Sequence, residues 1–303
     1  LVDATELERK QLSLSLTKKL ETYNFLPPAV KRKWNGIISY FHKDKFVPIG
    51  LWKEIKYVAE TYKFPLEITG LGEALFYKDV SREEFQEWVE SKFEGSIDTK
   101  GKPFFPYDYQ INTAYKILTN KICISELTTA AGKSLIIFIC IAYFQEKELS
   151  KKFLMIVPSI DLVIQAYENF HEYNSFLTEE NKIPLNIKQI VIVDECHRTK
   201  SNTIRECISK CVNVERRFGL TGTTPKQGTL DSLTLQAYLG PTVIEIRAEE
   251  LQEMGTIAEV EIAIVEFNYP EDVQKRFDLI RKELTGEDKG KLLKIEQDYV
   301  IQY

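Results

Sequence analysis

The sequence predicts an α/β protein in which a parallel sheet is wrapped by helices and preceded by a small α+β domain. After Phe105, short apolar runs alternate with helical stretches, and each run ends in a polar loop. This alternation is typical of parallel strands joined by crossover helices. Before residue 99 the pattern is mixed, and charge is unevenly distributed. A chain of 303 residues also has the length of about two domains.

The composition is that of a folded protein exposed to water. The chain is 44% apolar and 28% charged, with 14 glycines and 11 prolines, which argues against a disordered chain. No run is apolar over the length needed to cross a bilayer. The first residues lack the apolar block of a signal peptide, so we expect a cytoplasmic protein. Five cysteines without CxxC spacing favour reduced thiols over a disulfide framework or a zinc site.

Charge is segregated in the N-terminal third of the chain. Residues 14–63 hold ten Lys/Arg against four Asp/Glu, whereas residues 64–98 hold three against nine. Phosphate binding depends on local potential, so a basic segment can bind nucleic acid although the formal net charge is −5. We expect Lys31, Arg32 and Lys33 to contact phosphates. The alternative is a pair of solvated faces with no such partner.

The N-terminal region has signals for one hairpin and two helices. Asn35-Gly36 predicts a tight hairpin turn before a strand at 37–41. Apolar residues at helical spacing predict a helix over 50–62. A second helix is expected over 81–93, with Ser81 as N-cap and Glu84 completing a capping box. The polar stretch 95–101 then resembles a linker.

Four short apolar runs are the expected strands of the parallel sheet. They are Ile122–Ser125, Phe153–Val157, Ile190–Val193 and Phe218–Leu220. In an open α/β sheet, ligands bind at the carboxyl ends of the strands, so the loops after these runs should carry the chemistry.

The loop after the first strand has the residues of a phosphate-binding loop. Lys133 would reach the β- and γ-phosphates and the Ser134 hydroxyl would ligate Mg²⁺, which predicts ATP and Mg²⁺ as cofactors. The usual first glycine is replaced by Leu127, and Ala130 replaces a common loop glycine, so a left-handed backbone at Ala130 would be strained. The backbone expected to cradle the phosphates is that of Thr129, Ala130, Ala131 and Gly132.

Two acids follow the third strand, as in a Walker B segment. We assign Asp194 to the Mg²⁺ shell and Glu195 to positioning and polarising the attacking water. An exposed acidic pair closing a strand would be the simpler interpretation in isolation. The upstream phosphate loop favours the catalytic one.

These residues carry a resemblance to the superfamily 2 helicases. Asp194-Glu195-Cys196-His197 resembles the family's motif II. Tyr109-Gln110 with Ala114 resembles the adenine-recognition box, with Tyr107 where the family usually has arginine. The resemblance implies adenine contacts by Tyr107 and Gln110, and a motor domain of the RecA-like P-loop fold.

Two further segments follow in the family's order. Val157-Pro158-Ser159 resembles motif Ia, which implies that Pro158 and Ser159 touch a sugar-phosphate backbone. Leu220-Thr221-Gly222-Thr223 resembles motif III, which couples ATP hydrolysis to strand movement, with His197 as its partner. Four matches in order over about 115 residues are not a chance pattern.

Within the superfamily, the chain resembles the UvsW-type phage recombination helicases, a group similar to the XPB-like branch. Trp34 to Ile37 and Pro48 to Leu51 resemble the small DNA-binding domain of that group. The resemblance implies an ATP-dependent DNA helicase or translocase that remodels branched DNA, by fork regression and junction migration, in the host cytoplasm. The alternatives are an RNA helicase, and a nucleic-acid-binding module that ATP switches without unwinding. The motifs carry no information on oligomeric state.

The resemblance also sets the expected domains. Residues 1–98 would be the nucleic-acid-binding domain and linker, 99–250 the ATP-binding motor domain, and 251–303 a connector to a second RecA-like domain that this chain lacks. Only nineteen residues, His171 to Gln189, separate the motif Ia helix from the Walker B strand. A strand-helix crossover and motif Ib need more, so the sequence predicts that residues are missing between about Tyr173 and Pro184.

Overall fold

A computed structural model describes most of the first 256 residues of the chain. The described residues are 3–42, 46–67, 69, 80–147, 153–183, 190–197, 202–211, 214 and 216–256. They all belong to one compact unit, Leu1–Ile257. The expected connector therefore lies outside the described residues apart from 251–256. None of the helices in the described part is long and apolar enough to cross a membrane.

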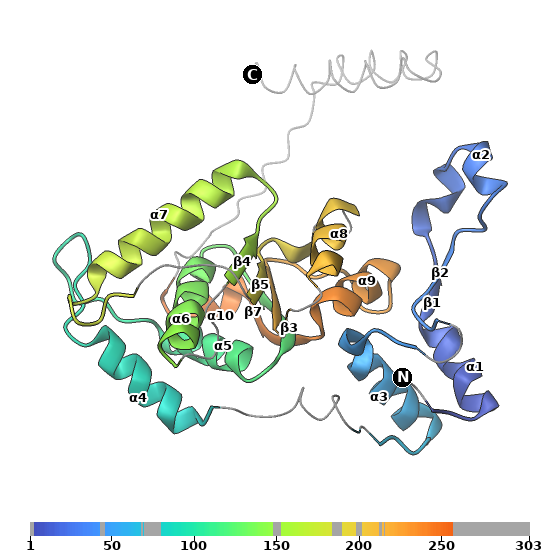
Figure 1. The fold of residues 1–303 in the computed structure, drawn as a ribbon, viewed down its shortest axis with the longest axis horizontal. Coiled ribbons are helices and arrows are strands. Elements are labelled where there is room, and N and C mark those ends of the chain that lie inside the picture. The colour runs from blue at the N-terminus through green and yellow to red at the C-terminus, as the bar shows by residue number, and fades with distance from the viewer. Residues whose placement is uncertain are drawn as a thin grey trace, which may run out of the picture. The chain divides into compact units, whose positions relative to one another are not determined.

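The centre of the fold is a five-stranded parallel sheet (Figure 1). Its strands are β3 (Ile122–Leu127), β4 (Phe153–Ile156), β5 (Ile190–Val193), β6 (Arg217–Thr221) and β7 (Thr242–Ile246), in the order β4-β5-β6-β3-β7. The four expected strands are confirmed, and β3 lies between β6 and β7. The predicted set did not include β7.

Helices cover both faces of the sheet. They are α4 (Arg82–Phe93), α5 (Asp108–Leu118), α6 (Lys133–Glu146), α7 (Ile160–Phe176), α8 (Asn202–Lys210), α9 (Leu230–Leu239) and α10 (Ala248–Glu253). Successive strand residues point to opposite faces. Cys123 accordingly packs in the core with α5 and α6, and its neighbour Ile124 packs with α8 and α9. A sheet buried on both faces by crossover helices confirms the predicted α/β class.

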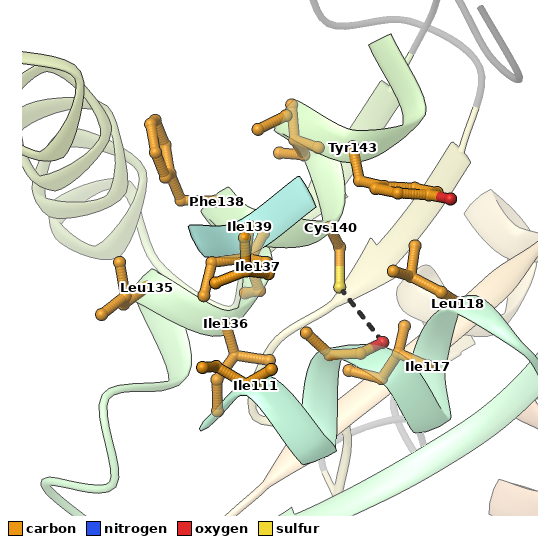
Figure 2. Close-up of a cluster of buried hydrophobic side chains, with 14 of the residues drawn as sticks. Ile111, Ile117, Leu118, Leu135, Ile136, Ile137, Phe138, Ile139, Cys140 and Tyr143 are labelled. Atoms are coloured by element: carbon orange, nitrogen blue, oxygen red, sulfur yellow. Dashed lines mark hydrogen bonds between the residues drawn. The ribbon is translucent and has the colours of Figure 1, made fainter. Parts of the chain in front are cut away.

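Helix α6 is buried along its length, as Figure 2 shows. Every residue from Leu135 to Phe144 is buried, and a helix that is apolar all round belongs in a core. Even Cys140 is enclosed: its Sγ donates to the carbonyl oxygen of Ala114 on α5 at 3.9 Å (Figure 2), and burial raises the pKa of this thiol. Burial on all sides fixes the N-terminus of α6 beside the carboxyl end of β3.

The described part of the N-terminal region contains a two-stranded antiparallel sheet, three α-helices and two 3₁₀ helices. They are α1 (Glu6–Ser15), β1 (Thr17–Lys19), the 3₁₀ helix η1 (Glu21–Phe25), α2 (Pro28–Lys31), β2 (Ile37–Ser39), the 3₁₀ helix η2 (Ile49–Leu51) and α3 (Trp52–Tyr62). The helix expected over 50–62 is confirmed. The strand at 37–39 is confirmed too, but the tight turn at Asn35-Gly36 is wrong, because β2 pairs with β1 across the long loop Glu21–Asn35. We call this loop the arm.

The N-terminal region is packed against the parallel-sheet region through α9. Leu51 and Val58 share a buried cluster with Leu230 and Leu233 of α9. The Tyr40 hydroxyl donates to Thr234 Oγ1 at 2.7 Å, and this contact also lies on α9. Lys53 Nζ reaches the carbonyl oxygen of Thr242 on β7 at 2.8 Å. Desolvation lowers the pKa of Lys53, which fits a lysine drawn into an interface.

Helix α4 packs in the main core, beside α5 and α6, through Phe85, Val89 and Phe93. Ser81 caps it as expected, accepting a hydrogen bond from the Glu84 backbone N–H at 3.0 Å. The Glu84 carboxylate pairs with Lys147 at 3.0 Å, and this is a tertiary contact between α4 and the end of α6. The domain boundary near residue 98 stays a prediction.

The predicted shortage of residues before the Walker B strand stays a prediction, because part of that segment lies outside the described residues. The backbone runs without a break through α7 to Ile183, and residues 184–189 are not among those described. Strands β4 and β5 are direct parallel neighbours. The crossover between them is α7 itself, whose 17 residues exceed the minimum that such a connection needs.

The packing of η2 on α9 generates a test. A Cβ added at Gly50 would lie 1.9 Å from the carbonyl oxygen of Gln236, so Gly50→Ala should lower the free energy of unfolding by about 1–3 kcal/mol. It should also loosen the N-terminal region, which limited proteolysis under native conditions would detect. In the control Gly101→Ala, the added methyl has nothing within 4 Å, while the left-handed backbone (φ 76°) costs an alanine roughly 1–2 kcal/mol. The control therefore loses comparable stability without touching the packing of η2 on α9, and the N-terminal region should be cleaved faster only in Gly50→Ala. Equal cleavage of the two variants would contradict the packing described.

Candidate nucleotide site

The phosphate loop lies between β3 and α6, where its backbone is tightly constrained. Gly132 is the residue before α6 and has a left-handed backbone, with φ of 74°. A Cβ at this position would lie 2.3 Å from Gln110 Nε2. Only glycine satisfies both conditions. The first backbone N–H groups of α6 are therefore placed where a helix N-terminus can bind a phosphate.

The strain expected at Ala130 is present. This residue has φ of 68°, and a left-handed backbone costs a residue with a Cβ roughly 1–2 kcal/mol. Ala130 and Thr129 are exposed, whereas Ala131 is fully buried. The loop therefore holds an unfavourable conformation at its tip, and its base is anchored in the core.

Lys133 is folded back over its own loop. Its Nζ donates to the Leu127 carbonyl oxygen at 3.3 Å and lies 4.0 Å from Glu195 Oε1. A Cβ at Gly222 would be 4.0 Å from the same Nζ, which places motif III beside this lysine. One cation therefore lies among the phosphate loop, the Walker B segment and motif III.

The Walker B acids follow β5 in a distorted backbone. The Asp194 N–H donates to the Ile156 carbonyl oxygen at 3.1 Å and so continues the sheet. Glu195 has φ of 50°, and its N–H donates to Asp194 Oδ1 at 2.9 Å. Desolvation raises the pKa of Asp194, opposed by this hydrogen bond and by the charge of Lys133. Non-glycine residues with positive φ gather at functional sites.

His197 connects the Walker B segment to motif III. Its Nδ1 lies 2.9 Å from Thr221 Oγ1 and 3.2 Å from Glu195 Oε2. The Thr221 hydroxyl donates to the Thr223 carbonyl oxygen at 2.9 Å, and an ionised carboxylate can only accept. We therefore assign a proton to Nδ1, shared between these two acceptors. The structure brings the expected pair together, and its coupling role stays a prediction.

Glu126 is a site residue that the motifs did not indicate. It precedes the phosphate loop on β3, and its carboxylate accepts hydrogen bonds from the Thr224 backbone N–H at 3.1 Å and from the Thr224 hydroxyl. Thr224 directly follows motif III, so this carboxylate joins the phosphate-loop strand to the motif III loop. The sequence offered one indication of this role, because Glu126 is a charged residue within the otherwise largely apolar strand β3.

Asn169 was missed as well. This residue lies on α7, and its Nδ2 donates to the Ser134 hydroxyl at 3.3 Å. The Ser134 oxygen keeps a lone pair and its proton. Asn169 orients the hydroxyl that the sequence assigned to Mg²⁺. No motif could reveal this contact, because it depends on how α7 packs against α6.

The adenine-box residues divide into one exposed ring and one buried amide. Tyr107 is 54% exposed and stacks on Tyr109, with ring centroids 5.8 Å apart and planes 11° apart. The Gln110 side chain is buried instead. It accepts from the Tyr107 N–H at 3.0 Å and donates to the Ala131 carbonyl oxygen at 3.2 Å. Gln110 thus supports the phosphate loop from below, and its contact with adenine stays a prediction.

The nucleic-acid residues predicted from motif Ia lie at the start of α7. The Ser159 hydroxyl caps that helix by accepting from the Leu162 N–H at 3.4 Å, and Pro158 precedes it. Lys31, Arg32 and Lys33 lie on the arm, with Arg32 and Lys33 exposed. Contacts of these five residues with nucleic acid stay predictions.

The residues present fit a Mg²⁺–nucleotide. The left-handed backbone at Gly132 and the buried base of the loop form a phosphate cradle, and Lys133 supplies a cation beside it. No group of three or more His, Cys, Asp or Glu side chains in the described segments could hold a metal alone. Mg²⁺ bound with a nucleotide takes one or two protein ligands besides phosphates and water. Ser134 and Asp194 are the candidates.

Known proteins resemble this chain in sequence and fold. A family model described as "Type III restriction enzyme, res subunit" matches residues 104–189. The ATP-dependent DNA helicase UvsW of Enterobacteria phage T4 is 25% identical over 89% of this chain and 59% of its own length. The chain thus spans about three fifths of that relative.

Two solved structures share the fold. A crystal structure of the bacteriophage T4 UvsW helicase matches with a TM-score of 0.65 at 23% identity, over 80% of this chain and 94% of that one. A second T4 UvsW structure matches with a TM-score of 0.65 at 22% identity, over 80% and 54%. The sheet and the placement of the phosphate loop define a RecA-like P-loop fold. In sequence and in fold the chain is similar to the superfamily 2 helicase UvsW of phage T4.

The strain at Ala130 generates a test. Ala130→Gly removes a left-handed backbone cost of roughly 1–2 kcal/mol and adds a glycine entropy cost of roughly 0.5–1 kcal/mol. We expect the free energy of unfolding in urea to rise by about 0.5–1 kcal/mol. Ala131→Gly is the matched control, because Ala131 is buried without positive φ, and it should destabilise. Equal losses in both variants would contradict the strain.

Proposed function

We propose that this chain is the ATP-binding part of a DNA helicase or translocase that remodels branched DNA. The observation that carries the proposal is the continuous set of contacts from Lys133 through Glu195 and His197 to Thr221. These contacts join a lysine of the phosphate loop to motif III, the segment that leads from the site into α9. Such a connection is what a motor needs and what a simple phosphate binder does not.

Each residue has a chemical role in this proposal. Lys133 leaves the Leu127 carbonyl and binds the β- and γ-phosphates, while Ser134 and Asp194 hold the metal. Mg²⁺, when bound, neutralises charge on the phosphates and favours the ionised form of Asp194. Glu195 orients the water that attacks the γ-phosphate. His197 transmits the position of Glu195 to Thr221, and motif III shifts with it.

DNA is the proposed substrate, with fork regression and junction migration as the activities. The relative from phage T4 is named a DNA helicase, and the N-terminal region presents Arg32 and Lys33 to solvent. Branched DNA, a place in recombination and repair, and a host-cytoplasm location are inferred from that likeness. An RNA helicase and an ATP-switched binding module are the alternatives that the following experiment separates.

Steady-state ATP hydrolysis with DNA or RNA as stimulant tests the proposal. We expect DNA to stimulate hydrolysis more strongly than RNA, and Lys133→Ala to abolish it, because the phosphates lose their cation. Glu195→Gln should bind Mg²⁺–ATP and hold DNA without turnover, because only the positioning of water is lost. Both variants should unfold in urea as the wild type does, within about 1 kcal/mol.

Three outcomes would count against the proposal. Equal stimulated hydrolysis in Lys133→Ala would remove the phosphate assignment. Stronger stimulation by RNA would favour the RNA helicase. Nucleotide-dependent DNA affinity without any turnover in the wild type would favour the switched binding module.

The basic arm is expected to contact DNA phosphates. Replacing Lys31, Arg32 and Lys33 together with Ala should weaken binding to all duplex sequences alike. It should reduce the slope of log K against log salt by about 0.9 for each lost contact. Fluorescence anisotropy, measured at salt concentrations from about 50 to about 200 mM, gives this slope. A parallel replacement of the exposed Lys56 on α3 is the control, and an unchanged slope in the triple variant would favour the solvated face.

A further inference from the structure

The arm is internally braced, although it is only a loop between two short strands. The Leu20 N–H donates to the Gly36 carbonyl oxygen at 2.8 Å and closes it. Inside, the Tyr23 hydroxyl donates to the Trp34 carbonyl oxygen at 3.0 Å, and the two rings meet edge to face with centroids 6.1 Å apart. Lys31 Nζ binds the Asn24 carbonyl oxygen at 2.6 Å. These bonds fix the relation of η1 to α2.

The braced arm holds one aromatic ring out in solvent. Phe25 ends η1 and is 88% exposed, the largest exposure among the apolar side chains of the described residues. Two backbone hydrogen bonds hold the chain on either side of Phe25. The Leu26 N–H donates to the Tyr23 carbonyl oxygen at 3.1 Å, and the Val30 N–H donates to the Pro27 carbonyl oxygen at 3.0 Å. Exposing a large apolar ring forgoes the free energy of burial, so an occupant is expected.

The surroundings of Phe25 identify the chemistry of that occupant. Lys31, Arg32 and Lys33 follow it closely in the arm, and Lys19 lies over the Tyr23 ring at 4.8 Å. An aromatic ring among cations matches a nucleic acid, which offers base faces for stacking and phosphates for the cations. In an intact duplex the base faces are covered by their neighbours. They are open at a branch point, where stacking is interrupted.

We propose that Phe25 is a stacking residue that inserts at the branch point of a DNA fork or junction, while the cations of the arm hold the flanking phosphates. The proposal rests on the proposed function and deepens it, because it gives the motor a means of recognising branched over linear DNA. Phe25 supplies shape recognition, and Lys31 to Lys33 supply affinity that is independent of structure.

Fluorescence of 2-aminopurine tests the proposal, with the whole chain and two DNA probes. One probe is a fork with 2-aminopurine at the branch point, and the other is a linear duplex with the same base internally. We expect the wild type to bind the fork more tightly and to quench the branch-point base. Phe25→Ala should bind the fork roughly tenfold more weakly and lose the quenching, with unchanged duplex affinity and salt slope. Phe25→Trp should keep both properties.

Controls separate this proposal from the function on which it rests. Tyr57→Ala removes another exposed aromatic side chain, 63% exposed and on α3, and should behave as the wild type. ATP hydrolysis stimulated by linear duplex should be the same in Phe25→Ala as in the wild type. If the wild type itself shows no stimulated hydrolysis, the proposed function is contradicted, and not the stacking role alone. The stacking role is overturned if Phe25→Ala binds the fork as the wild type does, if both probes weaken equally, or if Phe25 mediates binding to anionic vesicles but not to DNA.

Discussion

The structure depends most on the burial of α6 from Leu135 to Phe144. Ten successive residues of this helix are buried against α5, α7 and the sheet. A shift of the helix along its axis would disrupt all of these contacts. Its N-terminus therefore stays at the carboxyl end of β3, and the phosphate loop has to bridge a fixed gap. The left-handed residues Ala130 and Gly132 follow from that constraint. A core of this size can support a loop strained by roughly 1–2 kcal/mol.

Side-chain contacts link the phosphate loop and its strand to the Walker B segment and to motif III. Glu126 ties the β3 strand to the segment after motif III, while His197 lies between Glu195 and Thr221. Motif III leads into α9, and α9 carries the packing surface of the N-terminal region through Gln236 and Thr234. An unbroken series of contacts therefore connects the nucleotide site, through motif III and α9, to the strands at the base of the arm.

Local patterns in the sequence sufficed for the strands, the phosphate loop and the acidic pair. Those features depend on hydrophobic runs and turn residues within a few positions, as the strain at Ala130 illustrates. Contacts between distant segments were out of reach. Asn169 reaches Ser134 only because α7 packs on α6, and Gln110 lies under Gly132 for a similar reason. Asn35-Gly36 has the local sequence of a tight hairpin turn, but the strand that follows it, β2, pairs with β1 about twenty residues upstream. A local pattern therefore predicted the wrong turn. Strand β7 is rich in β-branched residues, which favour a strand, although it was not among the predicted strands.

The most direct test of the account is a crystal structure of this chain with Mg²⁺ and a non-hydrolysable ATP analogue. We expect Lys133 Nζ to leave the Leu127 carbonyl oxygen for the β- and γ-phosphates, Ser134 and Asp194 to share the metal, and Ala130 and Gly132 to keep their left-handed backbone. This expectation would be contradicted by a nucleotide bound elsewhere on the sheet, or by a Lys133 that stays on Leu127 while the phosphates lie in another loop.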